Sequence, residues 1–283
     1  MLKIGVNTFL LTSPFTNERI DIIRQFKAWG CDAVEIALED ASHIDAHLIK
    51  QALDDNDIVC SSICAAMGPG RDLRGTKAEQ QNSIDYITQV LEAMAILDCP
   101  VMVGPLYSTV GRAEQTGEDA YKAQWDTVAA HLKTLASRAD SLGRKLAIEP
   151  LNRYETDFIN TCDQALELIQ AIDHPAVGLL LDTYHMNIEE KDSAVAIRKA
   201  GKHLLHVHAC GCDRGAPGGD HINWEGIRDA LQAIDYSGSL VIESFTPEVK
   251  VVAKAASIWR SFEPSLEAIA LKGIPFLRSH FGG

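Results

Sequence analysis

Short apolar segments alternate along the chain with longer segments in which apolar residues recur every three or four positions. The run from Val177 to Asp182 (VGLLLD) is apolar over five consecutive residues, which is typical of a parallel strand buried on both faces. By contrast, residues 76–97 place isoleucine, valine, leucine and methionine on one stripe at helical spacing, which predicts a long helix. This alternation of strand and helix patterns predicts an α/β protein.

The same alternation continues through the whole chain and predicts eight strands with helices between them. The predicted strands are residues 3–8, 33–37, 58–64, 101–104, 145–149, 177–182, 203–208 and 240–243. The predicted helices are residues 17–30, 46–53, 76–97, 120–142, 162–172, 192–200 and 224–234, and a last helix begins within residues 249–259.

Eight strands that alternate with helices fit one (β/α)8 TIM barrel, a single domain spanning residues 1–283. A chain of 283 residues is within the range of single barrels, and no linker rich in proline, glycine or serine divides it. A doubly wound open sheet is the alternative. That fold needs only about six strands, and no GxGxxG motif follows the first predicted strand to favour it.

Charge and cysteine usage narrow the functional classes. The 26 lysines and arginines are outnumbered by 39 aspartates and glutamates, which gives a net charge of −13, the wrong sign for binding nucleic-acid phosphates. The 7 cysteines form no CxxC or CxxH pair, so we expect reduced thiols rather than a structural zinc site. The sequence has no apolar run that could span a membrane and no signal-peptide pattern at its start. We therefore expect a cytoplasmic protein that binds neither nucleic acid nor membranes.

Four consecutive predicted strands end in a side chain that can bind a metal ion, namely Glu149, Asp182, His208 and Glu243. The carboxyl ends of the strands form the functional face of a barrel, so these side chains should converge on one half of its mouth. Three carboxylates and one imidazole suit Mn²⁺, Mg²⁺ or Co²⁺ better than a thiolate-seeking ion. A divalent cation would also remove the repulsion among the carboxylates.

Five segments at or after the ends of the last four predicted strands contain acidic, basic or imidazole side chains. They are EPLNRYE at 149–155, LDTYHMNIEE at 181–190, HVH at 206–208, CDRGAPG at 212–218 and VIESF at 241–245. These segments resemble the D-tagatose 3-epimerase/D-psicose 3-epimerase family, and the resemblance covers nearly the whole chain. It implies a xylose-isomerase-like barrel in which Glu149, Asp182, His208 and Glu243 bind one divalent metal ion, with Mn²⁺ as our first choice.

The resemblance also implies that Glu149 and Glu243 form the acid/base pair, while Glu155, His185 and Arg214 bind the substrate, a small ketose. The chemistry agrees with these roles, because moving a proton from one face of carbon 3 to the other requires two bases on opposite sides. A metal ion that chelates the oxygens of carbons 2 and 3 would polarise the carbonyl group and stabilise an enediolate. We therefore predict a metal-dependent isomerase that epimerises a ketose at carbon 3.

Several alternatives stay open at this point. An aldose–ketose isomerase or a keto-glycoside epimerase could use the same metal and the same two glutamates. An apurinic endonuclease shares the barrel type but needs several zinc ions and a basic groove. A sugar-binding barrel without turnover would not need both bases. The resemblance also implies a homodimer or homotetramer, for which Trp259, Phe262 and Phe276 are a candidate contact surface.

Two further polar residues lie inside predicted strands. Glu35 interrupts an apolar strand, so its carboxylate must be paired or face the barrel mouth. His206 precedes His208 by two residues, and we expect it to pack deeper in the barrel. The loops after the first four strands should set substrate choice. Asn7 lies at the end of the first strand, where the family that this chain resembles often has an aromatic side chain, so the preferred sugar stays open.

Overall fold

The computed structural model describes residues 2–114 and 116–282, and it confirms the predicted α/β barrel. Eight parallel strands close on themselves, so that β1 pairs with both β2 and β8. The strands are β1 (Lys3–Asn7), β2 (Ala33–Leu38), β3 (Val59–Ala65), β4 (Val101–Gly104), β5 (Lys145–Ile148), β6 (Val177–Asp182), β7 (Leu204–His208) and β8 (Ser239–Ile242).

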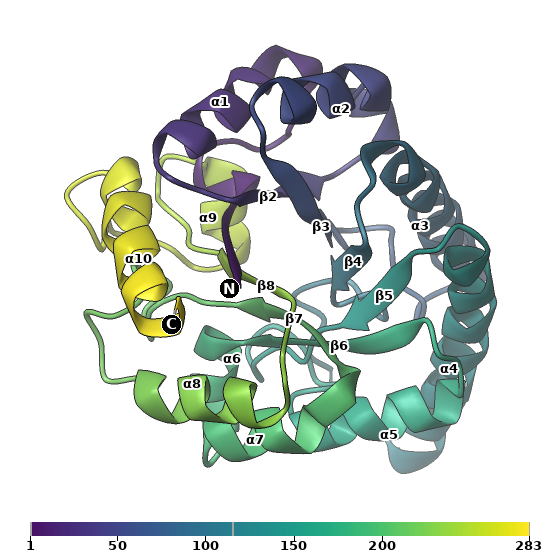
Figure 1. Ribbon diagram of the computed structural model, residues 1–283. Helices are drawn as coiled ribbons and strands as arrows, with labels where there is room; N and C mark the ends of the chain where they lie inside the picture. The colour runs from purple at the N-terminus through teal and green to yellow at the C-terminus, as the bar shows by residue number, and fades with distance from the viewer. Residues whose placement is uncertain (1, 115, 283) are drawn as a thin grey trace.

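The helices surround the strands, and the two termini lie near each other (Figure 1), since α10 packs against β1. The helices are α1 (Asp21–Ala28), α2 (Ala46–Asp55), α3 (Lys77–Leu97), α4 (Glu118–Ser141), α5 (Cys162–Ile172), α6 (Thr183–Glu189), α7 (Ser193–Ala200), α8 (Trp224–Ala233), α9 (Lys250–Ala255) and α10 (Leu266–Phe281). Short 3₁₀ turns occupy residues 8–10, 17–19, 41–43 and 201–203.

Local side-chain chemistry determines where several helices begin. The Thr76 hydroxyl accepts a hydrogen bond from the Glu79 backbone N–H, and the Glu79 side chain accepts one from the Thr76 backbone N–H. Thr161 and Gln164 form the same reciprocal arrangement at the start of α5. Each pair satisfies two backbone donors that the first helical turn leaves free, which fixes the helix start relative to the preceding loop.

Two regions differ from the prediction. Helix α6 was not predicted, because it is short and begins directly at the end of β6, where Asp182 caps it by accepting a hydrogen bond from the Tyr184 N–H at 2.6 Å. The single helix predicted to begin within residues 249–259 is instead two helices, α9 and α10. Ser257 has a φ of 57°, and a left-handed residue of this kind cannot continue a right-handed helix.

Two smaller expectations concern membranes and thiols. Within the described ranges, no helix is long and apolar enough to cross a membrane. The seven cysteines, all of which are described, are free thiols; six are buried and Cys212 is partly exposed. This agrees with the expectation of reduced cysteines.

Candidate active site

The carboxyl ends of β5 to β8 bring the four candidate metal ligands together. Asp182 and His208 are the last residues of β6 and β7, and Glu149 and Glu243 directly follow β5 and β8. Asp182 is paired in register with His208, so the two side chains leave their strands at the same height. One ligand atom from each of the four residues lies within 4.8 Å of those of the other three.

The imidazole of His208 lies at the centre of this cluster. Its Nδ1 is 3.2 Å from Glu243 Oε2, 3.6 Å from Asp182 Oδ2 and 3.8 Å from Glu149 Oε1. Both His208 Nδ1 and Glu149 Oε1 are buried without a hydrogen-bond partner. Buried polar atoms are normally paired, so these two atoms are available to bind a ligand.

The electrostatics of the cluster fit a divalent metal ion. Burial raises the pKa of Glu149 well above its usual value, and the neighbouring charge of Glu243 raises it further. Burial alone would lower the pKa of His208, but the carboxylates of Glu243 and Glu35 raise it well above its usual value. The negative charge of Glu243 contributes to both shifts, and a cation bound by these oxygen-rich donors would neutralise that charge.

Glu35 lies beneath the cluster and is completely buried. Its Oε1 is 2.8 Å from His208 Nε2, and its Oε2 is 2.9 Å from His206 Nε2. Burial opposes its ionisation, but His208 and His206 lower the pKa of Glu35 below its usual value. Of the two possibilities left open by the sequence, Glu35 is therefore paired, and His206 is buried in the barrel as expected.

A cavity of about 480 Å³ opens beside the cluster. Glu149 and Glu243 line it, and so do all three residues that the resemblance assigns to substrate binding, Glu155, His185 and Arg214. Much of the remaining wall is apolar and comes from loops after other strands and from α9. These apolar residues are Phe9, Met67, Pro69, Pro105, Val110, Leu151, Val251, Val252 and Ala255.

His185 presents a neutral imidazole to this cavity, because burial and the positive charge of Arg214 lower its pKa to about 3. Its Nδ1 accepts a hydrogen bond from the Asn152 backbone N–H at 3.0 Å. The hydrogen of the neutral ring therefore lies on Nε2, which is 3.6 Å from Glu149 Oε1. In this orientation His185 can donate a hydrogen bond to a molecule in the cavity.

Arg214 is held rigidly beside the ligand cluster, with its Nη2 3.2 Å from His185 Nε2. Its guanidinium pairs with Asp182 and lies 3.2 Å from Glu243 Oε2. The same group stacks over the rings of Tyr184 and Phe245, with 4.7 and 4.8 Å to the ring centroids. Its backbone has a φ of 70°, a left-handed conformation that costs about 1–2 kcal/mol in a residue with a Cβ atom. These contacts keep the guanidinium in one orientation despite that cost.

Glu155 is positioned by the loop after β5. Its Oε1 accepts a hydrogen bond from Asn152 Nδ2 at 2.8 Å, and its backbone oxygen accepts one from the Gly111 N–H at 2.7 Å. Burial raises the pKa of Glu155. Asn152, which holds both Glu155 and His185, received no role from the sequence, although its place between Glu149 and Glu155 in the EPLNRYE segment was a signal.

Asn7 was expected to help set substrate choice, and the structure places it elsewhere. It is fully buried and does not line the cavity, whereas Phe9 of the same loop does. Its Nδ2 donates hydrogen bonds to Glu35 Oε1 at 2.7 Å and to Glu243 Oε1 at 3.2 Å. The polar residue at the end of an apolar strand therefore contacts the ligand cluster rather than the cavity.

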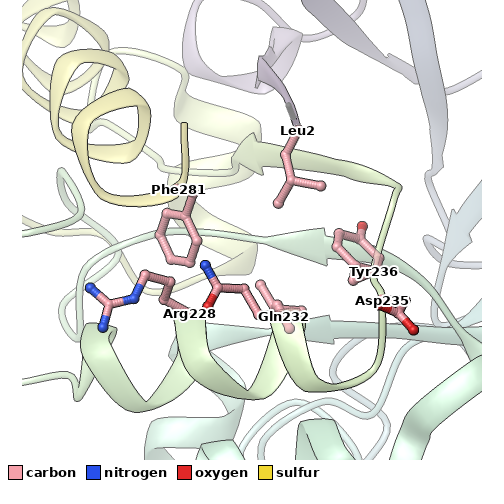
Figure 2. Close-up of a pocket in the computed structure, with 7 residues that line it drawn as sticks. Leu2, Arg228, Gln232, Asp235, Tyr236 and Phe281 are labelled. Atoms are coloured by element: carbon pink, nitrogen blue, oxygen red, sulfur yellow. The ribbon is translucent and has the colours of Figure 1, made fainter. Parts of the chain in front are cut away.

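Figure 2 shows a different cavity, of about 360 Å³, where Leu2, helix α8 and the end of α10 meet. Leu2 precedes β1, so this cavity lies at the end of the barrel opposite to the ligand cluster. It is lined by Leu2, Arg228, Leu231, Gln232, Asp235, Tyr236 and Phe281. One arginine and one aspartate do not form a metal or acid/base site, so the candidate active site is the cavity beside Glu149 and Glu243.

Comparison with known proteins identifies the family. The xylose isomerase-like TIM barrel model matches residues 23–280. The chain is also 36% identical to a probable ketose 3-epimerase of Synechocystis sp., over 99% of this chain and 97% of that protein. The chain belongs to the xylose isomerase-like TIM barrels, and among them to the ketose 3-epimerase family.

Two further comparisons agree with this assignment. A D-psicose 3-epimerase of Ruminiclostridium cellulolyticum is 32% identical to this chain, over 82% of this chain and 80% of its own length. A solved structure of an L-ribulose 3-epimerase superposes with a TM-score of 0.93 at 27% identity, covering 100% of this chain and 95% of that one. The predicted resemblance and the prediction of an isomerase-class enzyme are thus confirmed.

Proposed function

We propose that the protein is a divalent-metal-dependent ketose 3-epimerase. One observation supports this most strongly: the ligand atoms of Glu149, Asp182, His208 and Glu243 converge beside a cavity that two of them also line. The cavity volume of about 480 Å³ is within the range of small-molecule sites. Relatives that are named as epimerases of ketoses support the substrate class.

The four ligands would hold one metal ion through Glu149 Oε1, Asp182 Oδ2, His208 Nδ1 and Glu243 Oε2. When bound, such an ion polarises the oxygens on carbons 2 and 3 of a ketose, which makes the hydrogen on carbon 3 more acidic. We propose Mn²⁺ as this ion, with Mg²⁺ or Co²⁺ as the alternatives that the same donors would accept.

Glu149 and Glu243 would move the proton. They enter the cavity from β5 and β8, so a sugar bound between them can present one face of carbon 3 to each carboxylate. Which glutamate removes the proton first depends on the configuration of the sugar at carbon 3.

Three side chains would hold the sugar in this position. His185 can donate from Nε2, Arg214 can donate from its guanidinium, and Glu155 can accept hydrogen bonds from sugar hydroxyls. The donors His185 and Arg214 would also stabilise the negative charge that develops when carbon 3 loses its proton. The apolar part of the cavity wall would keep water away from the reacting carbon.

The test is incubation of protein loaded with Mn²⁺, Mg²⁺ or Co²⁺ with a panel of free ketoses in deuterated water. We expect inversion at carbon 3 and deuterium at carbon 3 of the product. Conversion to an aldose would instead identify an aldose–ketose isomerase. Turnover of keto-glycosides only would identify the second alternative, and no turnover with any metal would contradict the proposal.

We also propose a cytoplasmic homodimer or homotetramer, on the basis of composition and the family resemblance. Of the three aromatic residues considered for a subunit contact, Trp259 is the most accessible, with 73% of its surface exposed. Phe276 instead packs inside the chain against Trp224, at 5.5 Å between ring centroids. Light scattering on wild-type protein and on Trp259→Ala would test both the oligomeric state and this contact.

A further inference from the structure

Asn7 and Glu35 form a hydrogen-bonded pair directly beneath the proposed metal ligands. Both side chains are completely buried, and neither lines the cavity. Asn7 Nδ2 donates to Glu35 Oε1 at 2.7 Å and to Glu243 Oε1 at 3.2 Å. The same Glu35 oxygen lies 2.8 Å from His208 Nε2. The pair therefore contacts two of the four ligands without lining the cavity.

The orientation of the Asn7 amide follows from a local hydrogen bond. Its Oδ1 accepts from the Phe9 backbone N–H at 2.8 Å, which caps the 3₁₀ turn at residues 8–10. Because the amide oxygen is used in this way, the amide nitrogen must face the two carboxylates. One NH₂ group thereby connects Glu35 to Glu243.

The orientation of the Glu35 carboxylate is fixed from both sides. Ser62 Oγ donates to its Oε2, and His206 Nε2 lies 2.9 Å from the same oxygen. An ionised carboxylate only accepts hydrogen bonds, so His208 Nε2 must carry a hydrogen. This leaves the lone pair of a neutral His208 on Nδ1, the atom that faces Glu149, Asp182 and Glu243.

We propose that Asn7 and Glu35 are positioning residues of the metal centre. Glu35 selects the His208 tautomer that presents Nδ1 to the metal, and Asn7 holds Glu243 Oε1 so that Oε2 faces the metal. This inference rests on the proposed function of the cluster as a metal site. It also explains why a buried polar residue occupies position 7, directly after the apolar residues 4–6 of β1.

The first test is a calorimetric titration of metal-free protein with Co²⁺, which measures the Co²⁺ affinity directly. In Glu35→Gln we expect Co²⁺ affinity to fall about 10–100-fold, the usual effect of losing the carboxylate partner of a metal-binding histidine. Asn7→Asp should also weaken Co²⁺ binding, because it keeps an oxygen for the Phe9 N–H but replaces the NH₂ donor with a charge beside two carboxylates. Ser83→Ala is the control: it removes a buried hydroxyl that donates to the Glu79 backbone oxygen within α3 and contacts neither Glu35 nor a ligand, so wild-type affinity is expected.

Wild-type Co²⁺ affinity in folded Glu35→Gln and Asn7→Asp would overturn the inference. A second measurement needs no variant and so does not depend on whether the variants fold. In wild-type protein loaded with Zn²⁺ as a diamagnetic probe, long-range proton–nitrogen NMR should place the His208 ring hydrogen on Nε2. A hydrogen on Nδ1, with Nε2 bound to the metal, would contradict the role of Glu35.

Failure of this inference can be distinguished from failure of the proposed function, because metal affinity is measured without substrate. Wild-type protein that binds Co²⁺ but epimerises no ketose would contradict only the proposed reaction. Wild-type protein that binds no Co²⁺ would contradict both proposals. If ketose turnover is found, Asn7→Asp should lower kcat more than it changes KM, because Glu243 is misplaced while Glu155 and His185 still bind the sugar. An equal kcat with a changed KM would count against positioning.

Discussion

Nη2 of Arg214 lies 3.2 Å from Oε2 of Glu243, with both side chains almost entirely buried. The same guanidinium pairs with Asp182, so one positive group serves carboxylates from β6 and β8. A planar guanidinium can hold two carboxylates in fixed directions, whereas an ammonium group acts as a single point charge. The pair therefore links a proposed substrate-binding residue to a proposed proton-transfer residue.

This relationship predicts the effect of Arg214→Lys. We expect kcat/KM for the ketose to fall by about 10²–10³-fold, comparable to the loss of one donor that stabilises developing negative charge. Steady-state kinetics on metal-loaded protein would measure it. Arg260→Lys is the control, since Arg260 stacks on Phe262 outside the cavity and should have unchanged kinetics. Equal kinetics for both variants would show that the guanidinium fork is not needed.

Glu149→Gln and Glu243→Gln should each abolish net epimerisation. A glutamine cannot take or return a proton, and general acid/base groups contribute about 10²–10⁴-fold to rate. Each variant should still exchange the carbon 3 hydrogen of one epimer with deuterated water, because the other carboxylate still serves one face. Metal content must be measured in each variant, since both residues are proposed ligands. Product that forms without gaining deuterium in the wild type would argue against two bases.

Asp182→Asn should weaken metal binding and leave both glutamates in place. Asparagine also caps helices well, so the hydrogen bond to the Tyr184 N–H and the stability of α6 should survive. Activity should therefore be low at limiting Mn²⁺ and recover in part at high Mn²⁺. A metal titration of the initial rate would check this. Full activity in the presence of a strong chelator would be inconsistent with any role for the metal.

The buried thiol of Cys31 predicts a loss of stability at alkaline pH. Burial, together with the charge of Asp32, raises its pKa to about 12, whereas the unfolded thiol titrates near 9.0. Between these values the unfolded chain releases a proton that the folded chain keeps. The contribution of this thiol to the free energy of unfolding is therefore fully present below pH 9 and is lost as pH rises. The free energy of unfolding falls by up to about 1.4 kcal/mol for each pH unit in this range.

Urea unfolding at pH 8 and at pH 10.5 would measure this loss. In Cys31→Ala the difference in unfolding free energy between the two pH values should be smaller than in the wild type. The partly exposed Cys212 provides the comparison, and Cys212→Ala should change the pH dependence less. An identical pH dependence in wild type and Cys31→Ala would show that this thiol does not contribute.

The sequence by itself determined the barrel and the positions that meet at its mouth. Most of the eight buried strands are apolar runs because parallel strands are covered on both faces, and this property is local to each segment. The ends of β5 to β8 could be matched to Glu149, Asp182, His208 and Glu243 because the carboxyl ends of parallel strands in a barrel all lie on one face.

Only the tertiary structure decided how these side chains are oriented. Asn7 and Glu243 are 236 positions apart, and Glu35 and His208 are 173 apart, so no local pattern could show that they are hydrogen-bonded. Those contacts depend on closure of the barrel between β1 and β8 and on strand register. Which nitrogen of His208 faces the carboxylates, and why position 7 is polar, therefore follow from packing across the barrel, because a hydrogen bond requires a distance and a direction that spacing in the chain does not specify.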